Sequence, residues 1–387
     1  MTAPDRGFPT AEYAGRTARA QAAMARAGMA GLLLTTEPEV RYFSGFHTLF
    51  WQSPTRPWFL FLPASGRPVA VIPEIGAALM RRTWIEDIRS WSAPAPGDDG
   101  ISLLTELLSP LAERRETLGV MKGPETHLRM PLGDYERLVS GLGGLRIADA
   151  TGLVRGLRMV KSEAEIAKIA HVCAIGSRVF ARVPEIAREG QPLDALFRAV
   201  RREALAQGAD DMPYLVGGAE AGGYRDVISP PSDRALARGD VLMLDFGACR
   251  DGYFCDFDRN FAIGEADDAA RRAYDVLWRA TEAGRAAARP GTPCRELFRV
   301  MQAVIGAPDD HGGAVGRLGH GLGLQLTEWP SLAAWEETEI TENMVLTLEP
   351  SLAYGAGRVM VHEENIVVRT GGADLLTDRA APDLPVI

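Results

Sequence analysis

The chain has 387 residues, 46% of them hydrophobic, and a formal net charge of −9. This length is enough for two domains with buried cores, and the acidic balance argues against nucleic acid or an anionic membrane as the main partner. The four cysteines form no CxxC pair or disulfide framework, and neither an apolar signal core nor an apolar run of about 18 residues occurs. We therefore expect a protein of the cytoplasm.

The first part of the chain predicts a mixed α/β domain. An amphipathic helix is expected over 10–29, then a buried strand at 31–36 and a turn at Glu37-Pro38. Segment 46–58, FHTLFWQSPTRPW, is rich in aromatic residues and has two prolines, so it predicts an irregular loop that either folds onto its own domain or lines a pocket. The other elements expected here are strands on either side of Ser65-Gly66 and at 118–122, and helices near 74–83, 101–113 and 130–140.

The character of the sequence changes near residue 153, which divides the chain into predicted domains 1–153 and 154–387. Ser162 is the expected N-cap of a long helix, with Glu165 in the capping-box position. The elements expected after it are helices near 192–207, 267–289 and 293–304 and strands at 343–349 and 359–369.

A hairpin is expected over 241–263, VLMLDFGACRDGYFCDFDRNFAI. If it turns about Arg250-Asp251, Asp245 lies opposite Asp256; if it turns about Asp251-Gly252, the partner is Asp258. Carboxylates this close in a half-buried sheet repel each other unless a cation lies between them. A divalent metal ion is the simplest explanation.

Three later residues extend this acidic group. His320 lies among glycines in GRLGHGLGL, Glu349 ends the apolar run NMVLTLEP, and Glu363 lies in VMVHEENIVV. Carboxylates with one imidazole suit Mn²⁺, Fe²⁺, Co²⁺ or Zn²⁺. The alternative, that each acidic residue is separately solvated, explains the apolar surroundings of Asp245, Asp256 and Glu349 poorly.

The motifs D-F-G-x5-Y-x2-D-x-D-R, G-H-G-x-G-L, T-L-E-P and E-x-N-I-V-V, in this order, resemble the pita-bread metallohydrolases of the aminopeptidase P, prolidase and creatinase type. The resemblance implies an α+β fold, with a creatinase-type α/β N-terminal domain followed by a pita-bread catalytic domain. It also implies two divalent ions, with Mn²⁺ first among them, and a homodimer. The implied metal ligands are Asp245, Asp256, His320, Glu349 and Glu363.

Two histidines usual in peptidases of this family are missing. One position holds Thr327, in L-T-E-W-P, and the other falls near Ile228-Ser229. Neither threonine nor isoleucine can take up a proton as imidazole does. Asp258 replaces a threonine of the family pattern, and is either a carboxylate bonded to Arg259 or an additional ligand or proton acceptor.

The sequence offers few other groups for catalysis. His311, on a Gly-rich loop, could supply an imidazole, Glu328 could act as a base, and Glu349 or Glu363 could move the proton. Four residues are candidate substrate contacts: Trp51, Tyr224, Arg225 and Thr327.

Three functions remain open from the sequence. The first is a metal-dependent hydrolase that cleaves the C–N bond of an Xaa-Pro peptide or of a small non-peptide amide. The second is a metal-dependent lyase for a small zwitterion such as dimethylsulfoniopropionate, whose cation would suit the aromatic loop. The third is a binding module without catalysis, against which the five intact ligands argue.

Overall fold

The computed structural model describes residues 2–53, 56–306, 316–355 and 357–387. The chain forms two compact units, an N-terminal unit, Asp5–Arg158, and a C-terminal unit, Met159–Ile387, which residues 2–4 join. The expected boundary at residue 153 falls within helix α6 (Thr151–Met159), whose last residue opens the C-terminal unit. No helix in the described ranges is long and apolar enough to cross a bilayer.

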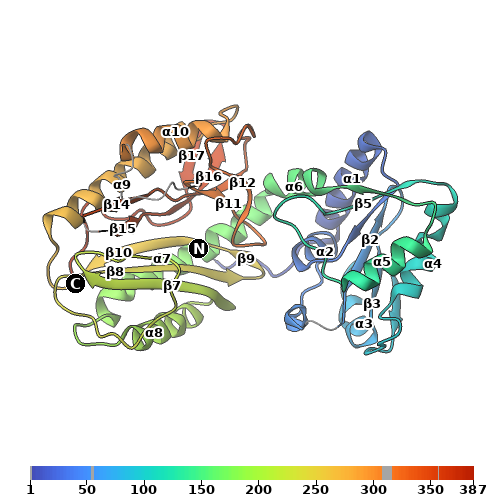
Figure 1. The fold of residues 1–387 in the computed structure, drawn as a ribbon, viewed down its shortest axis with the longest axis horizontal. Helices are drawn as coiled ribbons and strands as arrows, with labels where there is room; N and C mark the ends of the chain where they lie inside the picture. The colour runs from blue at the N-terminus through green and yellow to red at the C-terminus, as the bar shows by residue number, and fades with distance from the viewer. Residues whose placement is uncertain (1, 54–55, 307–315, 356) are drawn as a thin grey trace. The chain divides into compact units, whose positions relative to one another are not determined.

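The N-terminal unit is one mixed sheet with helices packed against it (Figure 1). Its strands are β1 (Gly31–Leu34), β2 (Phe59–Pro63), β3 (Val69–Pro73), β4 (Asp87–Trp91), β5 (Thr117–Val120) and β6 (Arg146–Asp149). Its helices, besides α6, are α1 (Thr10–Ala27), α2 (Glu37–Ser44), η1 (Leu49–Gln52), α3 (Glu74–Met80), α4 (Ile101–Glu113) and α5 (Leu132–Gly141).

The strand order of this sheet is β4-β3-β2-β1-β5-β6. Strand β1 pairs antiparallel with β2 and parallel with β5, and all four of its residues are buried. Leu33 and Phe61 pack on one face against Leu104 and Leu108 of α4. The hydrophobic residues of α4 recur at helical spacing, so burying that face drives the packing.

Two local predictions for this unit are wrong. The turn expected at Glu37-Pro38 is the first turn of α2, where proline is tolerated because the first N–H groups of a helix have no partner within it. Segment 46–58 is also not wholly irregular, since a 3₁₀-helix, η1, begins after Thr48, whose hydroxyl accepts from Phe50 N.

The C-terminal unit contains four helices and eleven strands among its described residues. The helices are α7 (Glu163–Ile186), α8 (Leu193–Ala206), α9 (Asp268–Ala287) and α10 (Cys294–Ile305). The strands are β7 (Asp211–Ala221), β8 (Asp240–Arg250), β9 (Tyr253–Phe254), β10 (Phe257–Ala262), β11 (His320–Gly321), β12 (Glu328–Ser331), β13 (Val345–Leu348), β14 (Ser351–Tyr354), β15 (Arg358–Val361), β16 (Glu364–Arg369) and β17 (Gly372–Leu375).

These strands form two larger sheets that lie between two pairs of helices (Figure 1). The sheet β10-β8-β7, with β9 beside β8, packs on α7 and α8. The sheet β12-β11-β13-β16-β17 and the hairpin β14-β15 contact α9. The acidic motifs lie on or beside strands of both sheets, at β8 and β10 in one and at β11, β13 and β16 in the other.

The start of α7 is attached to the β8–β9 hairpin. Ser162 and Glu165 form the expected capping box, and Glu165 Oε1 also accepts from the Tyr253 hydroxyl at 2.9 Å. Three residues further along α7, Lys168 donates to Asp251 at the hairpin turn, with 2.6 Å between Nζ and Oδ2. The capping residues therefore also fix the position of the hairpin.

The run 359–369 is not one strand. It divides at His362 and Glu363 into β15, which pairs with β14, and β16, which pairs with β13 and β17. The chain bends there because the two halves belong to different sheets. Strand β7, 11 residues long, was not expected from the sequence.

Candidate metal centre

The hairpin register brings two of the three aspartates face to face. The chain turns about Asp251-Gly252, and Asp245 on β8 lies opposite Asp258 on β10. The second of the two hairpin alternatives is therefore confirmed. Asp256 precedes β10, and the side chain of Asn365 on β16 holds its backbone. Three carboxylates thus lie within one short section of the hairpin.

His320 is positioned by the backbone around it. A Cβ at Gly319, whose φ is +140°, would lie 2.3 Å from the Thr347 carbonyl, and one at Gly321 would lie 2.4 Å from the Trp329 carbonyl. Glycine is needed at both positions, because strands β12 and β13 approach so closely. The Thr347 hydroxyl accepts from His320 N at 3.1 Å.

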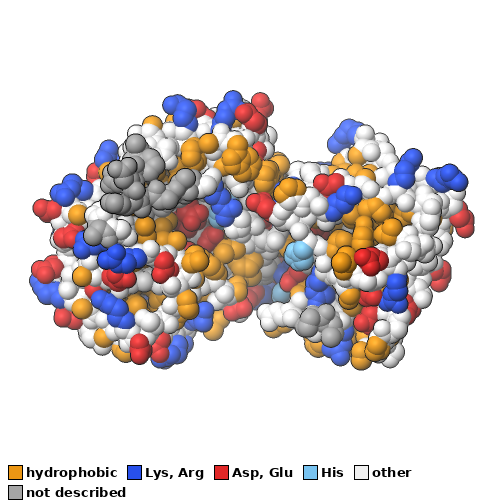
Figure 2. Space-filling model, in the orientation of Figure 1, with side chains coloured by type: hydrophobic (Ala, Val, Ile, Leu, Met, Phe, Trp, Pro, Cys, Tyr) orange, Lys and Arg blue, Asp and Glu red, His pale blue; other side chains and the backbone are white. Residues whose placement is uncertain are grey.

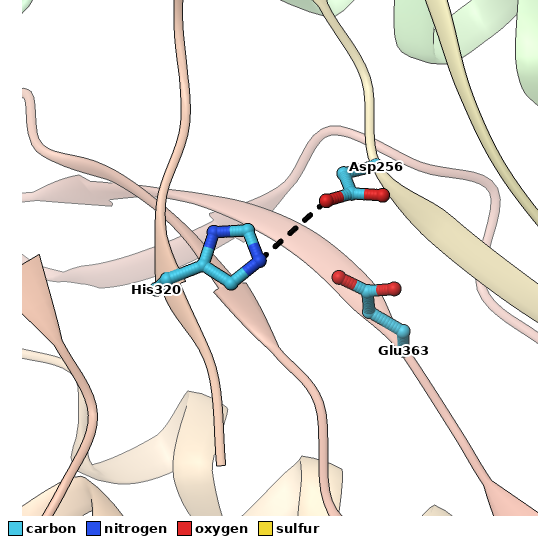
Figure 3. Close-up of side chains that lie close together, drawn as sticks. All are labelled: Asp256, His320 and Glu363. Carbon is cyan, nitrogen blue, oxygen red and sulfur yellow. Dashed lines mark ion pairs between the residues drawn. The ribbon is translucent and has the colours of Figure 1, made fainter. Parts of the chain in front are cut away.

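The imidazole is oriented with one nitrogen toward the carboxylates. His320 Nδ1 lies 2.8 Å from the Gly321 carbonyl, so it carries the proton. Nε2 is left as an acceptor, 3.5 Å from Asp256 Oδ2 and 3.8 Å from Glu349 Oε2. Figure 3 shows His320, Asp256 and Glu363 converging from three segments of the chain.

Ligand atoms of these three residues lie within 4.8 Å of one another. Asp256, His320 and Glu363 are all buried, whereas Glu349 keeps 33% of its side chain exposed. Asp245 is half-buried. The cluster therefore has a closed side and an open side, and Glu349 and Asp245 lie toward the open one.

Burial and mutual repulsion keep these carboxyls from ionising easily. Burial, and then the charge of Glu349, raise the pKa of Asp245 to about 8. Burial and the charge of Asp245 raise the pKa of Asp256 well above its usual range, and burial with the charge of Asp256 does the same for Glu363. Burial lowers the pKa of His320 to about 4, so the imidazole is neutral at pH 7. The imidazole is thus already in the neutral form that binds a divalent ion, whereas the carboxyls lose their protons when an ion binds and cancels their mutual repulsion.

Two oxygens of the cluster also have no hydrogen-bond partner among the described residues. These buried atoms are Asp245 Oδ1 and Glu363 Oε1. An unpaired buried carboxylate oxygen is costly, and a coordinated cation removes that cost. The residues present therefore fit divalent metal ions.

Two residues that the sequence did not single out act on the carboxylates of this cluster. The half-buried Tyr214, on β7, donates its hydroxyl to Asp245. The half-buried Arg317 opposes, with its positive charge, the rise that burial causes in the pKa of Asp256 and of Glu349. Figure 2 shows acidic side chains recessed in the face of this unit. Tyr214 was missed because β7 itself was missed.

The Asp258 carboxylate is bonded to Asn260 and not to the Arg259 side chain, which was one of the two alternatives left by the sequence. Its Oδ2 accepts from Asn260 Nδ2 at 2.8 Å, and Asn260 Oδ1 accepts from the Tyr224 hydroxyl at 3.0 Å. Consecutive strand residues point to opposite faces, so the Arg259 guanidinium instead donates to Glu364 Oε2 at 3.0 Å. Tyr224, expected to contact substrate, is buried and also accepts from Val361 N at 2.9 Å.

The remaining candidates lie outside the cluster of ligands. Glu328 pairs with Lys161 at 3.1 Å and accepts from Gln325 N at 3.1 Å, which is a structural arrangement. Thr327 is exposed, and Arg225 is exposed and pairs with Glu220 at 3.1 Å. His311 lies outside the described residues.

Trp51 lies in the N-terminal unit and is 7% exposed. Its ring packs against Trp58, with centroids 6.0 Å apart, and the Arg129 guanidinium lies 5.2 Å from its centroid. The aromatic segment thus folds onto its own domain. Near the position of the second absent histidine, Ile228 is 73% exposed and Ser229 donates to Asp226 at 2.9 Å.

Known proteins agree with this architecture. Residues 167–370 match Metallopeptidase family M24, and residues 16–160 match the Creatinase/Prolidase N-terminal domain. The chain is 30% identical over 389 residues to "Probable dipeptidase PepE" of Mycobacterium tuberculosis, covering 99% of this chain and 98% of that protein. It is 29% identical over 255 residues to the Xaa-Pro dipeptidase of Pyrococcus horikoshii, covering 64% and 71% of the two chains.

The crystal structure of dipeptidase PepE from Mycobacterium ulcerans superposes with a TM-score of 0.82 at 30% identity, over 98% of this chain and 99% of that one. The chain belongs to metallopeptidase family M24, with a creatinase/prolidase N-terminal domain before its catalytic domain. It is therefore a hydrolase of a family that depends on divalent metal ions.

Proposed function

We propose that this protein is a dinuclear metal-dependent dipeptidase that hydrolyses short peptides, Xaa-Pro dipeptides among them. The observation that carries the proposal is the convergence of Asp256, His320 and Glu363 on one point, with Asp245 and Glu349 beside them. The dipeptidase names of the two relatives described above support this substrate class and favour hydrolysis over elimination.

Asp245, Asp256, His320, Glu349 and Glu363 would hold the ions. Carboxylates with one imidazole suit Mn²⁺, with Fe²⁺, Co²⁺ and Zn²⁺ as alternatives. Such ions, when bound, make water more acidic and polarise a carbonyl group. The dimer and the cytoplasmic location remain predictions from the sequence.

The protein's own residues orient the ligands and handle the proton. The Tyr214 hydroxyl fixes Asp245, and Gly321 O fixes the imidazole ring through Nδ1. Glu349 keeps 33% of its side chain exposed, whereas Asp256 and Glu363 are buried, so its Oε2 is suited to take a proton from the attacking water and pass it to the leaving amine. Glu328 has no part in this scheme, because Lys161 and Gln325 N occupy its carboxylate.

The absence of the two family histidines limits which side chains can transfer a proton at this site. Arg317 and Tyr214 are the cationic and hydroxyl groups that act on the carboxylates of this cluster, and both can donate hydrogen bonds to an oxyanion or to a substrate carboxylate. Neither accepts a proton readily at neutral pH. The carboxylate of Glu349 must then both take the proton from water and give it to the leaving amine. This favours small substrates whose amine lies directly beside the carboxylate.

The test is to load the protein separately with Mn²⁺, Fe²⁺, Co²⁺ or Zn²⁺ and follow amine release from three panels. These are Xaa-Pro dipeptides, dipeptides without proline, and small N-acyl amides. Turnover of either dipeptide panel supports the proposal. Turnover confined to the amides, or none with two ions bound per chain, would overturn it.

The variant Asp256→Asn tests whether turnover depends on the proposed metal centre, because it removes a carboxylate 3.5 Å from His320 Nε2. We expect metal affinity and turnover to fall by at least about 100-fold. Asp226→Asn is the control, since Asp226 bonds only within its own loop, to Ile228 and Ser229, among the contacts that the structure describes.

A further inference from the structure

A cavity lies in the N-terminal unit, at the end of its sheet where α1 and α4 end and β5 and β6 begin. Its volume is about 620 Å³, within the usual range for small-molecule sites. The apolar part of its lining includes Met29, Phe61 and Leu111. Arginines 114, 115 and 146 also line it.

Positive charge is in excess around this cavity. Arg114 is neutralised by Glu116, with two N···O distances of 3.0 Å. Arg115 has no acidic partner among the described residues, and Arg146 makes one hydrogen bond, to the Thr117 hydroxyl at 3.2 Å. Both side chains are exposed. The lining therefore combines two uncompensated guanidinium groups with apolar surface.

Arg115 occupies a backbone position that normally belongs to glycine. Helix α4 ends in a Schellman motif, in which Glu116 N donates to Leu111 O at 2.9 Å and Arg115 N donates to Ala112 O at 3.0 Å. Arg115 is the left-handed residue of this motif, with φ of +56°. A side chain is strained there, and glycine would avoid the strain. Strain retained at one residue points to a role for its side chain.

We propose that this cavity binds a small organic anion, with its carboxylate or phosphate head between Arg115 and Arg146. Guanidinium groups bind such heads through paired charge-assisted hydrogen bonds. The apolar body of the ligand packs on Met29, Phe61 and Leu111, of which Phe61 and Leu111 belong to the hydrophobic core. The site is formed entirely by the N-terminal unit and needs no residue of the metal centre.

Isothermal titration of the metal-loaded full-length protein tests this, with octanoate, octyl phosphate, octanol and inorganic phosphate as probes. We expect octanoate or octyl phosphate to bind at one site per chain. Octanol and inorganic phosphate should each bind at least about 10-fold more weakly, since each lacks one half of the recognised chemistry. The stronger of the two amphiphiles identifies the head group.

The variant Arg115→Gln/Arg146→Gln should weaken binding of the stronger amphiphile at least about 10-fold. The control Arg81→Gln/Arg82→Gln removes the same charge from two exposed arginines after α3 that do not line the cavity, and should bind as the unchanged protein does. Arg115→Gly separates binding from folding, because it should raise the melting temperature and still weaken binding.

Several results would overturn the proposal. They are equal loss of binding in both double variants, binding of octanol as strong as that of the stronger amphiphile, and binding at several equivalent sites. Failure of all four probes to bind would overturn it as well.

Discussion

Asn365 holds the peptide groups on both sides of the Asp256 side chain. Its Oδ1 accepts from Asp256 N at 3.0 Å, and its Nδ2 donates to the Asp256 carbonyl. The same Oδ1 lies 3.3 Å from the Cys173 thiol on α7. All three residues are buried. This contact joins β16 to the hairpin, so it fixes the distance between Asp256 and Glu363, two residues before Asn365.

Asn365→Ala should therefore lower metal affinity by about 10- to 100-fold, as is usual when the support of a ligand is removed. The peptide groups of Asp256 lose their partners, and the carboxylate is no longer held toward His320. Competition with a chelator measures the effect. Cys173→Ala is the control, because it leaves both bonds between Asn365 and Asp256 in place. Equal loss of affinity in the two variants would show that packing, and not the amide, matters.

The stability of the metal-free protein should fall as pH rises from 6.5 to 8. Asp245 has a pKa of about 8 in the folded state and about 3.8 unfolded, so its protonated form favours folding and this contribution is lost as pH rises through 8. Through this one group, the free energy of unfolding falls by at most about 1.4 kcal/mol per pH unit. His320 has a pKa of about 4 in the folded state against 6.5 in the unfolded state. Its contribution to stability therefore rises with pH, but only below pH 6.5.

Bound metal should reverse this trend, because ions replace protons on the carboxylates. Melting temperatures in the presence of a chelator and of Mn²⁺, taken at pH 6.5, 7.2 and 8, measure both curves. A metal-free melting temperature that rises over this interval would contradict the prediction.

Asp258→Asn should keep the metal and stabilise the metal-free protein. Burial, and then the charge of Asp245 opposite it, raise the pKa of Asp258 well above its usual range, so the folded protein disfavours the charged carboxylate that the variant removes. Asparagine has the same shape and can still accept from Asn260. We expect an unchanged number of ions and a higher melting temperature with chelator. Loss of one ion per chain would instead make Asp258 a ligand.

The sequence predicted the elements whose residues carry a strong local signal. The capping box at Ser162 and the apolar strand before Glu349 are examples, whereas the metal ligands remain a prediction from the order of the motifs. Contacts between distant segments had no such signal. Two of the three lysines, Lys161 and Lys168, form buried ion pairs with Glu328 and Asp251, and neither partner can be found from spacing. Strand β7 was missed because glycines and a proline interrupt its pattern.

Arg317→Gln should weaken metal binding more at pH 6 than at pH 8. Burial raises the pKa of Asp256 and Glu349, and the charge of Arg317 opposes that rise. Without this charge both carboxyls hold their protons more tightly, and protons compete with metal most at low pH. Affinities measured at the two pH values test the difference. Arg198→Gln, at an exposed pair with Asp194, is the control and should show the same affinity as the unchanged protein at both.

Lys168→Met should lower the free energy of unfolding by about 3–5 kcal/mol, the usual cost of removing one partner of a buried ion pair. Lys168 and Asp251 keep 3% and 10% of their side chains exposed, and their 2.6 Å contact attaches α7 to the turn of the hairpin that carries Asp245 and Asp256. Adding Asp251→Asn should recover part of the loss, since it removes the unpaired charge. Urea unfolding of the metal-loaded variants measures both changes. A single-variant loss below about 1 kcal/mol, typical of exposed pairs, would show that the contact is not needed to hold the hairpin.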